Sequence, residues 1–160
     1  MRSDIMKSSF IILKDNNLII EAIIGIVNIE DLRTHRDILY SDKNYNTYYD
    51  VLMDIRDAKM EINIEELTSY LNYLSSINVC AVRKTAILTR QKNQAEYAKA
   101  FSSLNDKYSL KFGVFSNVND CVCFLDKKDI SKDEIRAHIR KLKNDPHYQW
   151  FKGPNAITGF

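Results

Sequence analysis

Charged side chains follow one of the most apolar short segments of this chain. The segment Val51–Met53 is followed closely by Asp54, Arg56 and Asp57. Two carboxylates can act together in general acid–base catalysis. A guanidinium can bind an anion through two parallel hydrogen bonds. These residues therefore predict either a site for an anionic ligand or a local salt bridge that organises the backbone before the next helix.

A second group of cations follows another short apolar segment. Arg90 and Lys92 come after Thr85–Thr89, where a helical pattern begins. A helix N-terminus with cations beside it favours phosphate or carboxylate groups. Neither GxGxxG nor GxxxxGK[ST] occurs, so a Gly-rich nucleotide cradle is not expected. The ligand-binding candidates are thus Asp54, Arg56, Arg90 and Lys92, with a solvated edge as the alternative for the last two.

The cysteines and histidines do not form a recognisable reactive set. Cys121 and Cys123 are two positions apart, which on a helix directs them to different faces. His35, His138 and His147 lack the spacing of metal ligands, and no GxSxG sequence is present. We therefore expect no metal, no cofactor and no catalytic residue.

The elements that position the candidates follow the order of an α/β domain. Phe10–Leu13 and Leu18–Ile20 flank Asp15–Asn17, which predicts a β-hairpin, and Asn28 then caps a helix. Three strand–helix repeats follow, with strands near residues 50–57, 85–89 and 110–115. Parallel strands require crossover helices, and this order supplies them. The prediction is a five-stranded mixed, mostly parallel sheet with its first strand antiparallel at an edge.

The last part of the chain predicts a helix and an aromatic tail. Ser131–Glu134 forms a capping box, and the apolar stripe after it consists of Ile135, Ile139 and Leu142. Tyr148, Trp150 and Phe151 follow and are the predicted interface residues. Exposing this much apolar surface is unfavourable, so residues 129–160 are expected to pack on the α/β domain of residues 1–128 or on a partner subunit, as in a homodimer.

Composition narrows the class of protein. The net charge of +2, from 23 basic and 21 acidic residues, is too balanced for a dedicated nucleic-acid binder. The longest apolar run, Leu18–Val27, is interrupted by Glu21 and is shorter than the ~18 residues of a membrane span. The odd number of cysteines argues against a disulfide framework, so we expect a cytoplasmic protein.

The order of elements, together with Val51–Arg56 and Ala86–Leu88, resembles the SpoIIAA-like branch of the STAS group, the fold of bacterial anti-sigma-factor antagonists. The resemblance covers roughly residues 8–126. It implies a regulatory or binding role, because members of that group act mostly by binding proteins, nucleotides or lipids. One departure concerns the serine that antagonists of the phosphoswitch type carry at the start of the helix after the third strand. The matching segment here, Ile62–Ile64, has Asn63 and no hydroxyl, so phosphorylation at this point is not expected.

These observations favour a non-catalytic regulatory or binding module that acts through protein contacts or through a small apolar or acidic ligand. The alternative is a small enzyme that acts on an anionic substrate with Asp54, Arg56 and Arg90. An oriented base in a compact cleft would favour the enzyme, and an apolar cavity or patch would favour the binding module.

Overall fold

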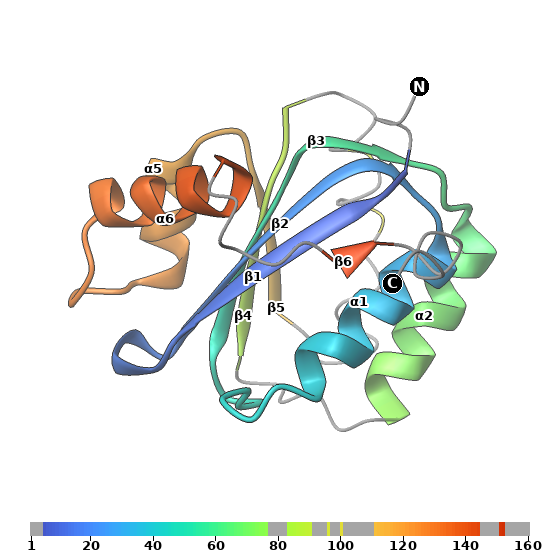
Figure 1. The fold of residues 1–160 in the computed structure, drawn as a ribbon, viewed down its shortest axis with the longest axis horizontal. Helices are drawn as coiled ribbons and strands as arrows, with labels where there is room; N and C mark the ends of the chain where they lie inside the picture. The colour runs from blue at the N-terminus through green and yellow to red at the C-terminus, as the bar shows by residue number, and fades with distance from the viewer. Residues whose placement is uncertain are drawn as a thin grey trace.

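An antiparallel hairpin opens the fold, and a series of parallel strands extends it (Figure 1). The computed structural model describes residues 5–76, 83–90, 96, 100, 111–144 and 151–152. Strand β1 (Lys7–Leu13) pairs with β2 (Leu18–Val27) through a short 3-10 turn, Lys14–Asn16. Asn17 closes this turn at φ 50° and ψ 45°, a left-handed conformation that Asn tolerates better than most residues.

The sheet order is β5-β4-β3-β2-β1-β6. Strands β2, β3 (Asp50–Met60), β4 (Lys84–Leu88) and β5 (Lys111–Phe115) are parallel. The predicted five-stranded mixed sheet is therefore confirmed. A two-residue strand, β6 (Phe151–Lys152), adds to it by pairing with the outer edge of β1.

Strand β3 is longer than the sequence pattern predicts. It does not end at the charged residues but continues to Met60, paired with β2 along this extension. An irregularity in the β2–β3 register lies beside Asp54 and Asp57, between the pairs that involve Ala22 and Ile24. Strand β4 reaches only as far as Asp54, so the charged residues lie where β4 ends rather than where β3 ends.

Helices cover both faces of the sheet (Figure 1). Helices α1 (Ile29–Tyr40) and α2 (Ile64–Ser76) pack on one face, and α5 (Val118–Leu125) and α6 (Lys132–Asn144) pack on the other. Each of the four begins at a polar residue whose side chain accepts a hydrogen bond from the first turn, namely Asn28, Asn63, Asn117 and Ser131. Such caps are typically worth about 1 kcal/mol each.

The predicted stripe of α6 is buried. Ile135, Ile139 and Leu142 are at most 3% exposed and pack in the same cluster as Leu18 and Ile20 of β2. Helix α6 is therefore an integral layer of the domain. The predicted division into an α/β domain of residues 1–128 and a helix with an aromatic tail of residues 129–160, packed on that domain or on a partner subunit, stays a prediction, since residues 145–150 and 153–160 lie outside the described part.

Candidate functional site

A carboxylate lies in the middle of the most apolar strand. Glu21 of β2 is fully buried beneath α1, on the sheet face that it shares with Ile19 and Ile23. Its Oε2 accepts a hydrogen bond from Arg36 Nη1 at 3.0 Å, and its Oε1 lies 2.5 Å from His35 Nε2. A buried charge requires such pairing. The contacts of the Glu21 carboxylate with the Arg36 guanidinium and the His35 imidazole therefore fix α1 on the sheet.

The network extends from Glu21 to two hydroxyl groups. His35 Nδ1 lies 2.7 Å from Ser8 Oγ on β1, and Arg36 Nε donates to Tyr70 Oη on α2 at 2.8 Å. Together with Glu21 these side chains tie β1, β2, α1 and α2 together. All of them are at most 3% exposed.

Ser8, His35 and Glu21 have the contacts of a hydrolytic triad, which sequence reasoning did not find. Nucleophilic catalysis requires that the serine reach a substrate. Ser8 is 1% exposed, and none of these three residues lines the cavity described below. With the serine buried, these three side chains hold α1 on the sheet.

Because the pKa of Glu21 is lowered in the folded protein, the free energy of unfolding is expected to fall in acid. Burial alone would raise its pKa, but Arg36 and His35 outweigh that effect and lower the pKa from 4.5 to about 2. A lowered folded-state pKa gives stability that is present above pH 4.5 and is lost as the pH falls towards 2. At about 1.4 kcal/mol per pH unit, this contribution is roughly 3 kcal/mol.

The measurement is urea unfolding of wild type and Glu21→Gln between pH 7 and pH 3. Because the amide introduced by this substitution cannot titrate, the difference in the free energy of unfolding between the two proteins should shrink as the pH falls. A difference that stays constant over this range would show that Glu21 is not responsible.

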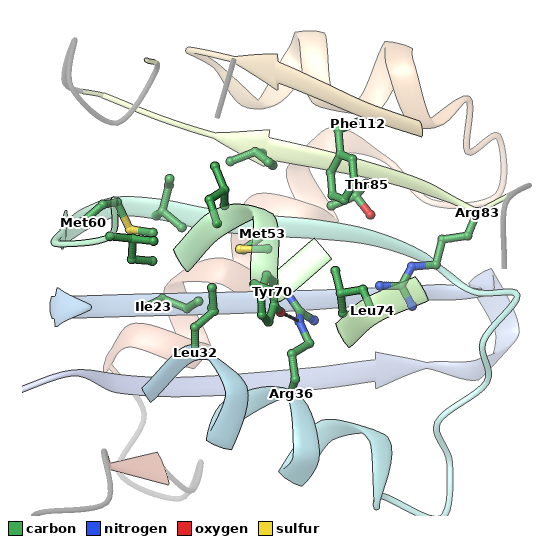
Figure 2. Close-up of a pocket in the computed structure, with 14 residues that line it drawn as sticks. Ile23, Leu32, Arg36, Met53, Met60, Tyr70, Leu74, Arg83, Thr85 and Phe112 are labelled. Carbon is green, nitrogen blue, oxygen red and sulfur yellow. Dashed lines mark hydrogen bonds between the residues drawn. The ribbon is translucent and has the colours of Figure 1, made fainter. Parts of the chain in front are cut away.

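An apolar cavity of about 60 Å³ lies between the same sheet face and helices α1 and α2 (Figure 2). Aliphatic and methionine side chains from three strands and both helices form most of its wall, among them Ile23, Met53 and Leu67. The polar lining residues are Arg36, Tyr70, Arg83 and Thr85. Among the described residues that line it there is no carboxylate, histidine or thiol, so this part of the wall is suited to an apolar group.

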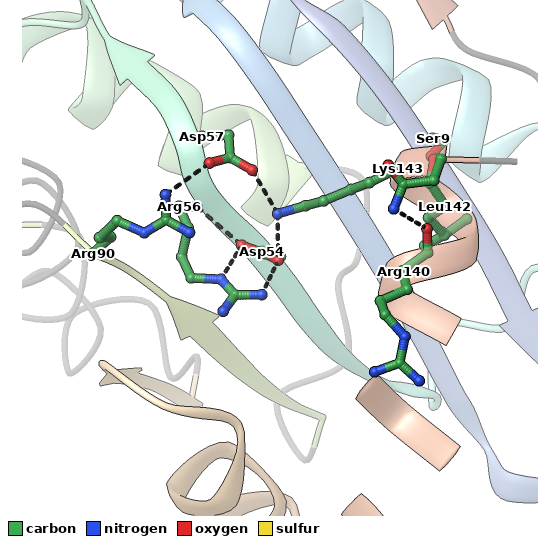
Figure 3. A network of polar contacts seen from close by, with 9 residues as sticks. Ser9, Asp54, Arg56, Asp57, Arg90, Arg140, Leu142 and Lys143 are labelled. Carbon is green, nitrogen blue, oxygen red and sulfur yellow. Dashed lines mark hydrogen bonds and ion pairs between the residues drawn. The ribbon is translucent and has the colours of Figure 1, made fainter. Parts of the chain in front are cut away.

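A second charged cluster lies on the opposite face of the sheet, beside α6 (Figure 3). Asp54 is fully buried, and both of its oxygens bind Arg56, with Nε at 3.0 Å and Nη2 at 2.8 Å. Lys143 Nζ reaches across from α6 to Asp54 at 2.9 Å and to Asp57 at 2.8 Å. Arg90 Nη1 binds the other oxygen of Asp57 at 3.0 Å.

These cations keep the two aspartates ionised. Burial would raise the pKa of Asp54, but the hydrogen bonds from Arg56 and the charge of Lys143 lower it below its usual value. The hydrogen bond from Lys143 also lowers the pKa of Asp57. Neither carboxylate is therefore tuned to exchange protons near neutral pH, which is the property that general acid–base catalysis needs.

Replacing Lys143 with Met is expected to destabilise the protein by about 1–3 kcal/mol, because it removes one partner of a buried carboxylate. Arg56 remains as the second partner, so the loss should stay below that of an unpaired buried charge. The matched control is Lys141→Met, an exposed position on the same helix, which should change stability by less than about 0.5 kcal/mol. Thermal unfolding of both variants tests this, and equal effects would contradict the role of Lys143.

The structure brings three of the predicted ligand residues together. Asp54, Arg56 and Arg90 belong to this one cluster, to which Lys143 also contributes although it was not predicted.

Other predicted residues cannot be placed in the structure. Lys92 lies outside the described residues, as do Tyr148 and Trp150. The backbone of Phe151 pairs with Ser8 of β1. Ligand binding by the cluster and the interface role of the aromatic tail stay predictions.

The comparisons with known proteins bear on the fold. No protein-family model matches the chain, and no match was found among curated proteins. Among solved structures, the chain is similar to an uncharacterised protein from the DUF3478 family with a SpoIIAA-like fold, from Shewanella loihica. The identity is 16% and the TM-score 0.54, over 78% of this chain and 98% of the other. The fold is SpoIIAA-like.

Within this SpoIIAA-like fold, the start of α2 is occupied by a structural cap. Asn63 Oδ1 accepts a hydrogen bond from Glu66 N at 2.8 Å, and Glu66 Oε1 accepts one from Asn63 N at 3.0 Å. This reciprocal pair satisfies two backbone donors at the helix start. Asn63, which the sequence places where phosphoswitch antagonists carry a serine, therefore caps the start of α2.

Three further properties concern the described residues of the SpoIIAA-like domain. Cys121 is buried, and burial followed by the charges of Asp54 and Asp120 raises the pKa of its thiol to about 12, so it is not a ready nucleophile. Nowhere in the described ranges do three or more His, Cys, Asp or Glu side chains gather closely enough to hold a metal ion. None of the helices described there is long and apolar enough to cross a membrane.

Proposed function

We propose that this protein is a non-catalytic binding module, and that its ligand site is the cavity between the sheet and helices α1 and α2. The observation that carries the proposal is the composition of the cavity wall, which is mostly apolar with arginine, tyrosine and threonine as its polar members. Apolar walls with a few placed polar groups are typical of small-molecule sites. A SpoIIAA-like fold supports a regulatory or binding role in general terms.

The alternative of an enzyme built on Asp54, Arg56 and Arg90 has weaker support. In this cluster each carboxylate already binds two cationic side chains, and Asp54 is fully buried. A substrate anion would have to compete with both carboxylates for the same cations. The cavity needs no such exchange to accept a ligand.

The proposal is tested by native mass spectrometry of the purified protein and by thermal shift with small apolar compounds. A ligand that binds only the folded state raises the melting temperature, by an amount that grows with the logarithm of the ratio of ligand concentration to Kd. Ile55→Phe, which places a larger side chain in the cavity wall, should fold and should lose the shift.

The matched control is Ile19→Phe on β2, which faces the same side of the sheet but does not line the cavity. It has no space for the larger ring and is expected to cost about 1–3 kcal/mol while keeping any ligand-induced shift. If neither mass spectrometry nor the shift assay detects a small molecule with wild type, the cavity is packing space and the proposal is wrong.

A further inference from the structure

Arg83, the residue before β4, is buried, and its charge has no acidic partner among the described residues. It is 6% exposed and lines the cavity. Its Nη1 donates a hydrogen bond to Tyr45 Oη at 2.9 Å, while its Nε has no hydrogen-bond partner within the part of the chain that the structure describes. Within the described part of the chain, none of the ion pairs involves Arg83. A buried guanidinium without a carboxylate is costly.

Two arginines line the cavity, and among the described residues only one of them has an acidic partner. Arg36 also lines the cavity, but its charge is compensated by Glu21 at 3.0 Å. Arg83 has no equivalent acid, so one positive charge remains uncompensated among the described residues. A single negative charge brought by a ligand would complete the balance, and a doubly charged phosphate would exceed it.

Arg83 lies on the same side of the chain as the residues of β4 that line the cavity. Arg83, Thr85 and Ile87 alternate along one side of the strand and all line the cavity. Figure 2 shows Arg83 near one end of the cavity and Met60 near the other. A ligand with its charged group beside Arg83 therefore has an apolar wall along the rest of its length.

We propose that the cavity binds a short-chain monocarboxylic acid, whose carboxylate is held by Arg83 and whose alkyl group lies against the apolar wall. This inference rests on the proposed function and adds the chemistry of the ligand. The flat guanidinium matches a carboxylate in shape and can donate two parallel hydrogen bonds to it. The unpartnered Nε of Arg83 is one of the donors available for this contact.

The volume sets the length of the alkyl group. A cavity of ~150 Å³ holds benzene, which has about six carbon atoms. By the same ratio, the 60 Å³ available here suits about two or three non-hydrogen atoms, so the cavity takes the alkyl group alone and the carboxylate lies at the end of the cavity beside Arg83 (Figure 2). Butanoate fits this size and is the test ligand, and decanoate is too long.

The experiment is a titration of the whole protein with butanoate, 1-butanol and decanoate, followed by NMR chemical shifts. We expect butanoate to bind about tenfold more tightly than 1-butanol, because the two differ mainly in a charge-assisted hydrogen-bonding group. Arg83→Met should remove this preference and still bind 1-butanol. Arg83→Lys keeps the charge but not the guanidinium and should show a reduced preference, which provides a second variant if Arg83→Met does not fold.

The outcomes separate this inference from the proposed function. Equal binding of butanoate and 1-butanol to wild type would overturn the carboxylic acid but leave a binding cavity. An unchanged preference in the folded Arg83 variants would overturn the assignment of Arg83 as the anchor, and tighter binding of decanoate would overturn the size limit. Failure of wild type to bind any of the three would overturn the inference, while an apolar compound found by mass spectrometry or thermal shift would still support the proposed function.

Discussion

Truncation after Lys128 is expected to abolish cooperative unfolding. It removes four side chains that are at most 5% exposed and that pack against β2, β3 and β4, namely Ile130, Ile135, Ile139 and Leu142. At about 1.5–3 kcal/mol each, their burial contributes about 6–12 kcal/mol, which is comparable to the whole stability of a typical domain. Thermal unfolding followed by circular dichroism should show no sharp transition.

Point variants in α6 provide the graded version of this test. Leu142→Ala should cost about 2–5 kcal/mol because it leaves a cavity in the core, whereas Arg140→Ala, on the exposed side of the helix, should cost less than about 0.5 kcal/mol. If the truncated protein kept both the melting temperature and the sedimentation coefficient of the full chain, α6 would not be part of the core.

Glu21→Gln is expected to lower the free energy of unfolding at pH 7 by about 3–5 kcal/mol, the usual cost of breaking a buried ion pair. The reason is that Arg36 keeps its charge in a fully buried position after its carboxylate partner is removed. Urea unfolding at pH 7 measures the loss. Glu61→Gln is the control, since Glu61 is an exposed carboxylate whose ion pair with Lys59 is long, at 4.0 Å, and it should have almost no effect.

The double variant Glu21→Gln with Arg36→Met tests whether the two residues act as a pair. The effects of substitutions within one network do not add. The double variant should therefore lose at least about 1 kcal/mol less free energy of unfolding than the sum of the losses in the two single variants. Simple additivity would show that Glu21 stabilises α1 through other contacts.

Local patterns were enough to predict the first hairpin and the four described helices. The asparagine and serine caps of α1, α2, α5 and α6 satisfy backbone donors within three residues of the cap, and the turn at Asn17 depends on one backbone conformation. Interactions this short in sequence are visible in the sequence itself. The end of β3 was missed because its last residues are held by pairing with β2, which the local pattern of charges does not reveal.

The polar networks depend on contacts between distant residues. Asp54 and Arg56 were found because they are two residues apart, but Lys143 is 86 residues from Asp57 and could not be connected to it. Glu21 offered a signal, because a lone acid inside an apolar strand has to find a partner. Its partners, His35 and Arg36, were identifiable only once α1 was placed on the sheet. The cavity depends on how side-chain volumes fill the interior, and the spacing of residues in the sequence does not predict that.

The position of α6 has a consequence for synthesis on the ribosome. Ser9 of β1 donates a hydrogen bond to the carbonyl of Leu142, 133 residues later, and α6 covers a face of the first hairpin. The strands that are made first therefore keep an uncovered apolar face until nearly all of the described chain has been translated. Contacts between distant residues slow folding, and uncovered strands promote aggregation. Nascent chains of this protein are thus expected to be clients of ribosome-associated chaperones until α6 has emerged from the exit tunnel.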